Sequence, residues 1–84
     1  MNDADIRASI IEALTSVAPD IEADTIRGAV NFRDQFDFDS MDFLNFVTAL
    51  HQRFGIDIPE ADYPRMLSLD RCVAYVAEKT AAAG

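Results

Sequence analysis

The sequence has very few of the residues that hold a fold together through covalent bonds or metals. It contains one cysteine, Cys72, and one histidine, His51. A single cysteine excludes an internal disulfide and fits a reducing compartment, so we expect a cytoplasmic protein. One cysteine and one histidine also provide no cluster of ligands for a transition metal.

Long apolar segments and excess positive charge are absent as well. No run approaches the ~20 apolar residues that a membrane-spanning helix needs. The acidic start, MNDADIRASI, is not typical of a secretory signal. Fifteen Asp and Glu residues outnumber 7 Lys and Arg residues, which gives a net charge of −8. This charge disfavours binding to nucleic acid or anionic lipid and favours partners with basic docking surfaces.

The residues that are present suffice for a folded core. Half of the 84 residues are hydrophobic, which argues against a disordered chain. A chain of this length predicts a single domain over residues 1–84. We expect this domain to be a monomer.

Hydrophobic periodicity predicts three main helices. The first covers residues 3–18, starts at a cap on Asn2 or Asp3 and ends before Pro19. The second covers residues 40–54 and ends at Gly55. Its apolar stripe consists of Phe43, Phe46, Val47, Leu50 and Phe54.

The third main helix and the connections have less regular patterns. Ser68 is the expected cap of a last helix that ends near residue 82, with Cys72 at the edge of its inward face. Residues 19–38 are predicted to form a long loop, fastened to the core by its apolar side chains, with one helical turn after Asp24. Pro59 and Pro64 allow only a short helix between them and the last one. The predicted fold is all-α: a small antiparallel bundle of three main helices plus one short helix, with a long loop between the first and second helices.

A serine between acids, in the segment DFDSMDFL (residues 37–44), opens the second helix. Asp39 is the predicted N-cap, and Asp42 completes a capping box, which leaves the hydroxyl of Ser40 free. A calcium loop is excluded because Met41 occupies the fifth position, where an oxygen ligand is required. A catalytic nucleophile is disfavoured because His51 lies roughly 16 Å away at ~1.5 Å per helical residue. We therefore do not expect an enzyme.

The remaining interpretation is that another protein modifies Ser40, and the surrounding residues resemble those of acyl carrier proteins. Phe38-Asp39-Ser40-Met41-Asp42 is similar to the D-S-L motif of that family. Three further segments resemble the loop before the motif, the loop after the second helix, and the last helix; they are NFRDQF (31–36), FGIDIPE (54–60) and Leu69, Val73 and Tyr75. The resemblance covers nearly the whole chain in order.

The resemblance implies that Ser40 receives a 4′-phosphopantetheine arm from coenzyme A. A separate phosphopantetheinyl transferase, with its own Mg²⁺, would attach it. Acyl groups would then be carried as thioesters on the thiol of the arm and delivered to fatty acid, lipid or polyketide enzymes with basic docking surfaces. A peptidyl or aminoacyl carrier and an unmodified helical interaction module remain alternatives.

The sequence departs from the family pattern in two places. Where the family commonly has Leu-Gly-x-Asp-Ser, Asp37 replaces the glycine and the aromatic Phe38 precedes Asp39. The second helix is also less acidic than is usual for the family. After Asp42, no acid stands at the outward positions, which are Asn45, Thr48, His51, Gln52 and Arg53.

These departures predict a specialised carrier with a dedicated pathway. Met41 and Leu44 are expected to form an apolar partner-binding face, with Met66 of the short helix at its other edge. The alternative is that Met41 and Leu44 are half-buried against the short helix. Asp37, Asp39 and Asp42 are expected to attract basic partners.

Overall fold

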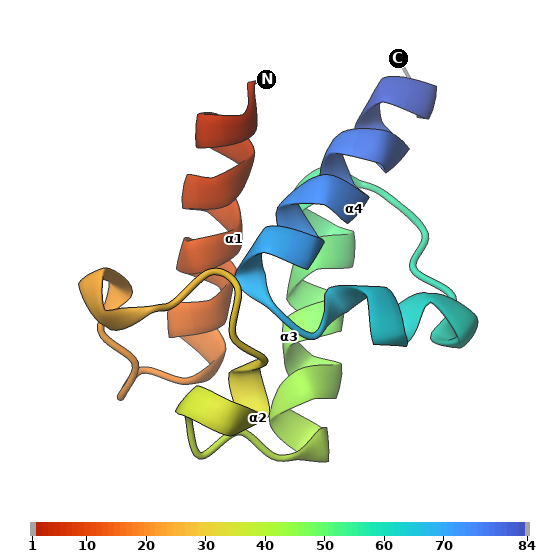
Figure 1. Cartoon of the computed structure of the whole chain (residues 1–84). Coiled ribbons are helices and arrows are strands. Elements are labelled where there is room, and N and C mark those ends of the chain that lie inside the picture. Colours follow the sequence, from red (N-terminus) through yellow and green to blue (C-terminus); the bar gives the residue numbers. More distant parts are fainter. Residues whose placement is uncertain (1, 84) are drawn as a thin grey trace.

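The computed structural model describes residues 2–83, and this part of the chain is helical without any strand (Figure 1). The elements in order are α1 (Asp3–Val17), the 3₁₀ turn η1 (Ala23–Thr25), α2 (Phe32–Gln35), α3 (Ser40–Phe54), the 3₁₀ helix η2 (Glu60–Met66) and α4 (Leu69–Ala83). The all-α prediction is confirmed, and the bounds of the second main helix agree with the predicted residues 40–54.

Helix α1 is the element on which the bundle is assembled. It contacts both α3 and α4, and η2 packs against α4. Figure 1 shows that α1 runs in the opposite direction to α3 and α4. Helix α2 and the start of α3 lie at the end of the bundle away from the N- and C-termini. None of the helices in residues 2–83 is both long and apolar enough to span a bilayer.

The ends of the long helices are set by local hydrogen bonds. At α1, the side chain of Asn2 accepts from the backbone N–H of Asp5 at 2.9 Å. At α3, Gly55 ends the helix in the left-handed conformation with φ of 63°, which residues with a Cβ rarely adopt. At α4, Oγ of the buried Ser68 accepts from the N–H of Arg71 at 3.3 Å. These contacts confirm the predicted caps.

The core lies between the three long helices. From α1 it takes Ile6, Ile10 and Leu14, which are at most 2% exposed. From α4 it takes Leu69, Cys72, Tyr75 and Val76, all similarly buried. The expectation that Cys72 lies at the edge of the inward face is wrong: its side chain is 0% exposed and lies within the face.

The long connection after α1 is held to the rest of the molecule by main-chain hydrogen bonds. The N–H of Phe32 donates to the carbonyl of Leu67 at 2.8 Å, and the N–H of Asp70 donates to that of Gly28 at 3.0 Å. A side chain at Gly28 would collide with Asp70, since an added Cβ would lie 2.3 Å from its Oδ1. The connection is pinned as predicted, but it contains the extra helix α2.

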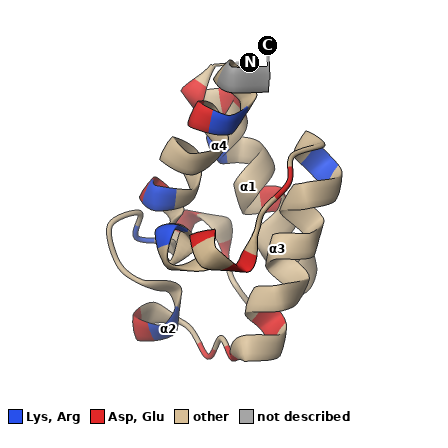
Figure 2. Ribbon diagram, turned by 90° about the vertical axis from the view of Figure 1, so that its right-hand side faces the viewer, with Lys and Arg blue, Asp and Glu red and all other residues tan. Residues whose placement is uncertain are grey.

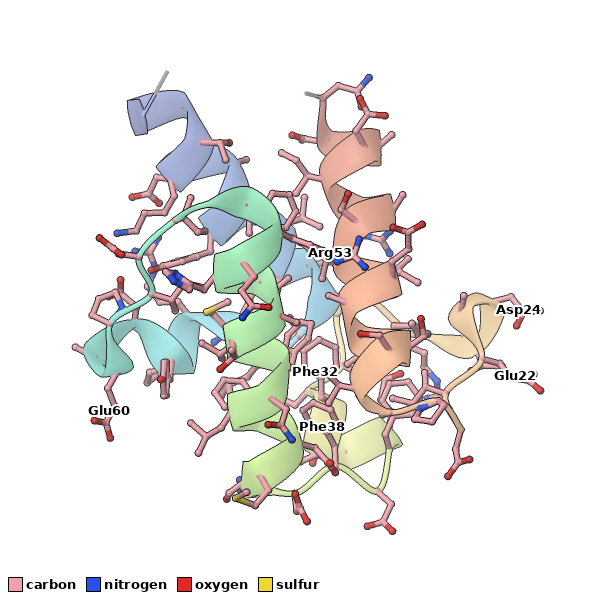
Figure 3. All side chains as sticks on the ribbon, turned by 180° about the vertical axis from the view of Figure 1, so that it is seen from behind. Glu22, Asp24, Phe32, Phe38, Arg53 and Glu60 are labelled. Carbon is pink, nitrogen blue, oxygen red and sulfur yellow. The ribbon has the colours of Figure 1, made fainter. Side chains whose placement is uncertain are left out.

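Three phenylalanine rings join this connection to α3. We call Phe32, Phe38 and Phe46 the aromatic triad; their ring centroids are 5.5 to 6.3 Å apart. All three side chains are buried. Such tilted and edge-to-face pairs are favourable in addition to the area that they bury. In Figure 3, Phe32 and Phe38 lie between α1 and α3, beside α2.

The placement of Met66 corrects the sequence analysis. Its side chain is 0% exposed, so it is part of the core and not the edge of a partner-binding face. The cause is the docking of η2 onto α4: the hydroxyl of Tyr75 donates to Asp62 Oδ2 at 2.7 Å, and the Sγ of Cys72 donates to the carbonyl of Met66 at 3.3 Å. Burial, with this bond to Asp62, raises the pKa of Tyr75 to about 12.

Truncation of Phe46, the ring that α3 contributes to the triad, tests this description of the core. Phe46→Ala should lower the free energy of unfolding by roughly 3–5 kcal/mol, because it removes a buried ring and leaves a cavity. Urea unfolding followed by circular dichroism measures this change. The exposed residue Asn45 on the same helix provides the control, since Asn45→Ala should change stability by about 0.5 kcal/mol or less. Equal effects of the two substitutions would contradict the assigned core face.

Candidate functional site

Ser40 is the first residue of α3, and its side chain is exposed. The capping box beside it is complete without its hydroxyl. Oδ1 of Asp39 accepts from the N–H of Asp42 at 2.9 Å, and Oδ2 of Asp42 accepts from the N–H of Asp39 at 3.2 Å. The prediction that Asp39 caps α3 is confirmed, and the hydroxyl of Ser40 is left for other contacts.

The hydroxyl of Ser40 has a partner that the sequence analysis missed. Nη2 of Arg33 donates to its Oγ at 2.8 Å. Arg33 lies on α2, seven residues before Ser40, and the path of the chain between them brings them together. Arg33 makes none of the ion pairs found among residues 2–83. The only signal in the sequence was its place in NFRDQF, a segment similar to the loop before the family's motif.

Three aspartates lie within three residues of Ser40 in the sequence. Asp37 and Asp39 are exposed, and Asp42 is half-buried. Figure 2 shows acidic residues in the loop before α3 and in its first turn, an uncharged middle, and a basic residue near its end. The outward positions that lack acids, namely Asn45, Thr48, His51, Gln52 and Arg53, are exposed. The negative charge of α3 is therefore concentrated around Ser40.

Two apolar side chains next to Ser40 are open to solvent. Met41 is 65% exposed and Leu44 is 44% exposed, and these two are the exposed large hydrophobic residues of the described chain. The alternative that both are half-buried against the short helix is therefore wrong. We call Met41 and Leu44 the apolar patch.

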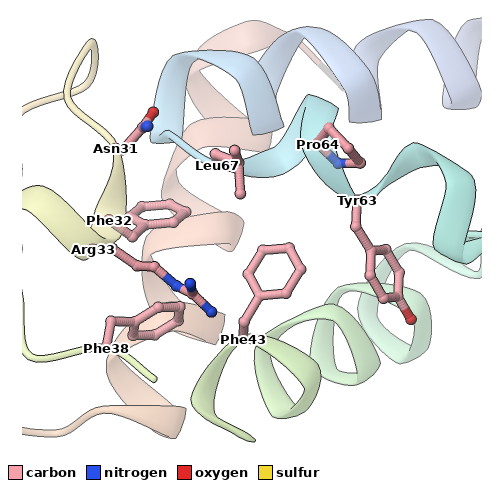
Figure 4. A pocket seen from close by; sticks show the side chains of 8 residues that line it. All are labelled: Asn31, Phe32, Arg33, Phe38, Phe43, Tyr63, Pro64 and Leu67. Carbon is pink, nitrogen blue, oxygen red and sulfur yellow. The ribbon is translucent and has the colours of Figure 1, made fainter. Parts of the chain in front are cut away.

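An apolar cavity of about 290 Å³ lies next to the site. Its lining residues, shown in Figure 4, come from the segment around α2, from α3 and from the segment around η2; they are Asn31, Phe32, Arg33, Phe38, Phe43, Tyr63, Pro64 and Leu67. The guanidinium of Arg33 reaches between the rings of Phe38 and Phe43. Arg33 and Phe38 also line a shallow hollow around Ser40, so they connect the hydroxyl to the cavity.

The departures from the family motif have structural explanations. Phe38 is only 5% exposed because its ring belongs to the aromatic triad. Asp37, at the position where glycine is common, does not have the positive φ that would require glycine, since Gly55 alone has one among the described residues. An aspartate is therefore accommodated there without backbone strain.

Cys72 and His51, the other side chains considered as reactive groups, are unsuited to that role. Burial raises the pKa of the Cys72 thiol well above its usual range, so the thiol stays protonated. His51 is far along α3, and its Nδ1 donates to the carbonyl of Ile56 at 2.6 Å. In residues 2–83 there is no cluster of His, Cys, Asp or Glu that could hold a metal ion.

Comparisons with known proteins agree with the site. The family model described as "Phosphopantetheine attachment site" matches residues 5–76. The acyl carrier protein of Picosynechococcus sp. is 35% identical over 63 residues, which cover 75% of this chain and 78% of that protein. The acyl carrier protein of Campylobacter hominis is 32% identical over 72 residues, 86% of this chain and 85% of that protein. The chain belongs to the acyl carrier protein family.

A solved structure supports the fold. The acyl carrier protein from Enterococcus faecalis superposes with a TM-score of 0.72 at 23% identity, over 94% of this chain and 99% of that chain. Members of the family are carriers and not catalysts. This chain carries acyl groups on a covalently attached 4′-phosphopantetheine arm.

The capping box predicts that Asp39 stabilises the start of α3. Asp39→Ala should destabilise the acyl carrier by roughly 1 kcal/mol, because an N-cap hydrogen bond is lost. In a chain of this size, that corresponds to a fall of about 4–8 °C in the melting temperature. Thermal unfolding followed by circular dichroism checks this expectation. Asp39→Asn should retain most of the stability, since asparagine caps equally well. A larger loss from Ser40→Ala than from Asp39→Ala would contradict the assigned cap.

Proposed function

We propose that Ser40 is the attachment point of the arm. The observation that supports this most directly is its exposed hydroxyl at the first position of α3, within the Asp-Ser-Met segment that resembles the family motif. A transferase must bring coenzyme A to the acceptor, so the acceptor has to be reachable from solvent. Ser40 meets this requirement without any loss of helix capping.

The transfer needs a base that the carrier does not supply. Oγ of Ser40 attacks the phosphorus of coenzyme A that bears the pantetheine. A new O–P bond forms, the P–O bond to adenosine 3′,5′-bisphosphate breaks, and the hydroxyl proton must be removed. Within residues 2–83, the hydrogen-bond partner of Oγ is the guanidinium of Arg33, which cannot accept a proton. We therefore assign the base to the phosphopantetheinyl transferase, with Ser40 as its substrate.

We further propose that this is a specialised carrier with a dedicated acyl-loading enzyme. Residues 1–84 would form one carrier domain that works as a monomer in the cytoplasm. Asp37, Asp39 and Asp42 attract enzymes with basic docking surfaces, because opposite charges steer the encounter. The apolar patch contributes contacts that depend on shape and are little affected by salt. The exposed face of α3 beyond Asp42 lacks the acids that would serve many basic enzymes equally.

Modification of the purified protein tests the attachment point. After incubation with coenzyme A and a phosphopantetheinyl transferase, the intact mass should rise by one arm. The arm should also add one reactive thiol, because the buried Cys72 should not react with a thiol reagent in the folded protein. Mass spectrometry and thiol titration under native conditions give two independent measurements.

The control for this experiment is Ser40→Ala. It should gain neither mass nor a reactive thiol, while its helical circular dichroism signal stays intact because Asp39 still caps α3. Modification of the alanine variant at another residue, or a wild type that never gains mass, would overturn the assignment. Subsequent loading with fatty acids rather than amino acids would separate the acyl carrier from a peptidyl carrier.

The apolar patch predicts a difference between two enzymatic reactions. Leu44→Asn should impair loading by the dedicated acyl-transferring enzyme more than it impairs phosphopantetheinylation, because it removes an apolar contact without changing the charge. Because Leu44 is 44% exposed, the fold should tolerate the change. Values of kcat/KM for both reactions measure the difference. Equal losses in both would show that Leu44 belongs to a docking surface common to both enzymes.

Asp37→Asn tests the contribution of charge and is compared with Leu44→Asn. In residues 2–83 the carboxylate of Asp37 makes no ion pair, whereas Asp42 takes part in the cap. Loss of the Asp37 carboxylate should slow both phosphopantetheinylation and acyl loading at low salt. The effect should be smaller at high salt, since the Debye length shrinks to about 10 Å at 0.1 M. The effect of Leu44→Asn should persist at high salt.

A further inference from the structure

Arg33 is held beside Ser40 by contacts that do not involve Ser40 itself. The preceding residue, Phe32, is buried in the aromatic triad, and its N–H donates to the carbonyl of Leu67. Gln35, two residues later, accepts from the N–H of Arg27 and donates to its carbonyl, both at 2.8 Å. The backbone on both sides of Arg33 is therefore held in place, and the side chain of Arg33 extends from it to Ser40.

The hydrogen bond of Arg33 is unusual for its surroundings. Three aspartates lie close to Ser40 in the sequence, yet among residues 2–83 the guanidinium pairs with none of them and donates to a neutral hydroxyl. A guanidinium has five N–H donors, arranged as a fork that fits two oxygens of a phosphate or carboxylate. Only one bond to Ser40 is made, so donors remain for an anion that would be built onto this oxygen.

We propose that Arg33 binds the phosphodiester group of the arm on Ser40 and thereby holds the base of the arm at the mouth of the apolar cavity. This inference rests on the proposed attachment at Ser40. Esterification converts Oγ into a bridging oxygen and places two anionic oxygens on the adjacent phosphorus. These oxygens come within reach of the same guanidinium that contacts Oγ at 2.8 Å. A hydrogen bond to a neutral hydroxyl is thus replaced by bonds to an anion, an ion pair in which the guanidinium can contact two oxygens at once.

The position of Arg33 also gives the arm a direction. Arg33 and Phe38 line both the hollow around Ser40 and the cavity next to it. The apolar patch, Met41 and Leu44, lines neither. A phosphate held by Arg33 therefore keeps the arm on the cavity side of Ser40 and leaves the apolar patch uncovered. Because Arg33 is exposed, the pair is screened by salt and can open when an enzyme takes the arm.

Nuclear magnetic resonance of the modified protein tests this contact without any enzyme assay. The holo forms of the wild type, Arg33→Gln, Arg33→Lys and Arg27→Gln are prepared, and their masses and circular dichroism are verified. Arg27→Gln is the matched control, since it removes the same charge from the same connection, and Arg27 lines neither the hollow nor the cavity. The ³¹P chemical shift of the arm and the Nε–H signals of the arginines are then recorded at low and high salt.

The ³¹P signal of the wild type should differ from that of Arg33→Gln at low salt and approach it at high salt. Arg27→Gln should match the wild type, and Arg33→Lys should fall between the wild type and Arg33→Gln. The Nε–H signal of Arg33 should shift between apo and holo protein more than that of Arg27. A ³¹P signal that is the same in the wild type and in Arg33→Gln, with the arm attached, overturns this inference alone. A wild type that gains no arm at Ser40 overturns the proposed function and this inference together.

Discussion

The packing of Phe32, Phe38 and Phe46 is the contact on which the site depends. Phe32 precedes Arg33, Phe38 precedes Asp39 and Ser40, and Phe46 lies on the buried face of α3. With ring centroids 5.5 to 6.3 Å apart, the triad fixes where α2 lies relative to the first turn of α3. The distance between Arg33 and Ser40 follows from this packing. The aromatic residue before Asp39, which departs from the usual family motif, is thus a structural part of this site.

The elements that were predicted well are those whose signals are local. The bounds of α3 follow from an acid cap at Asp39, an unbroken apolar stripe and a glycine at position 55, all within the helix or next to it. The same holds for α1, which is capped by Asn2 and ends before Pro19. Caps and 3.6-residue periodicity depend on neighbouring residues only, so a sequence contains them in full. The exposed hydroxyl of Ser40 followed from the same argument, because the capping box of Asp39 and Asp42 is complete without it.

The parts that were missed depend on contacts between distant residues. Helix α2 has four residues, too few for a periodic pattern, and its anchor is the hydrogen bond from Phe32 to Leu67, which is distant in the sequence. The contact between Arg33 and Ser40 depends on that anchor. Met66 was misplaced for a similar reason. Its 3₁₀ helix contains Pro64, and the direction of its side chain is decided by docking onto α4 and not by the pattern of η2.

The proposed site combines attraction of basic partners with a contact for an anion, and the two requirements act over different distances. A partner that approaches from solvent senses the summed charge of −8, within which a single guanidinium changes the field little. At the oxygen of Ser40, by contrast, the nearest charge is that of Arg33, which touches it at 2.8 Å. Since Coulomb energy falls with distance and salt screens remote charges first, this contact decides the local potential. Without Arg33, a phosphodiester on Ser40 would add negative charge next to Asp37, Asp39 and Asp42. In the proposed arrangement, Arg33 lets the protein combine an acidic surface for docking with a cationic contact at the attachment point of the arm.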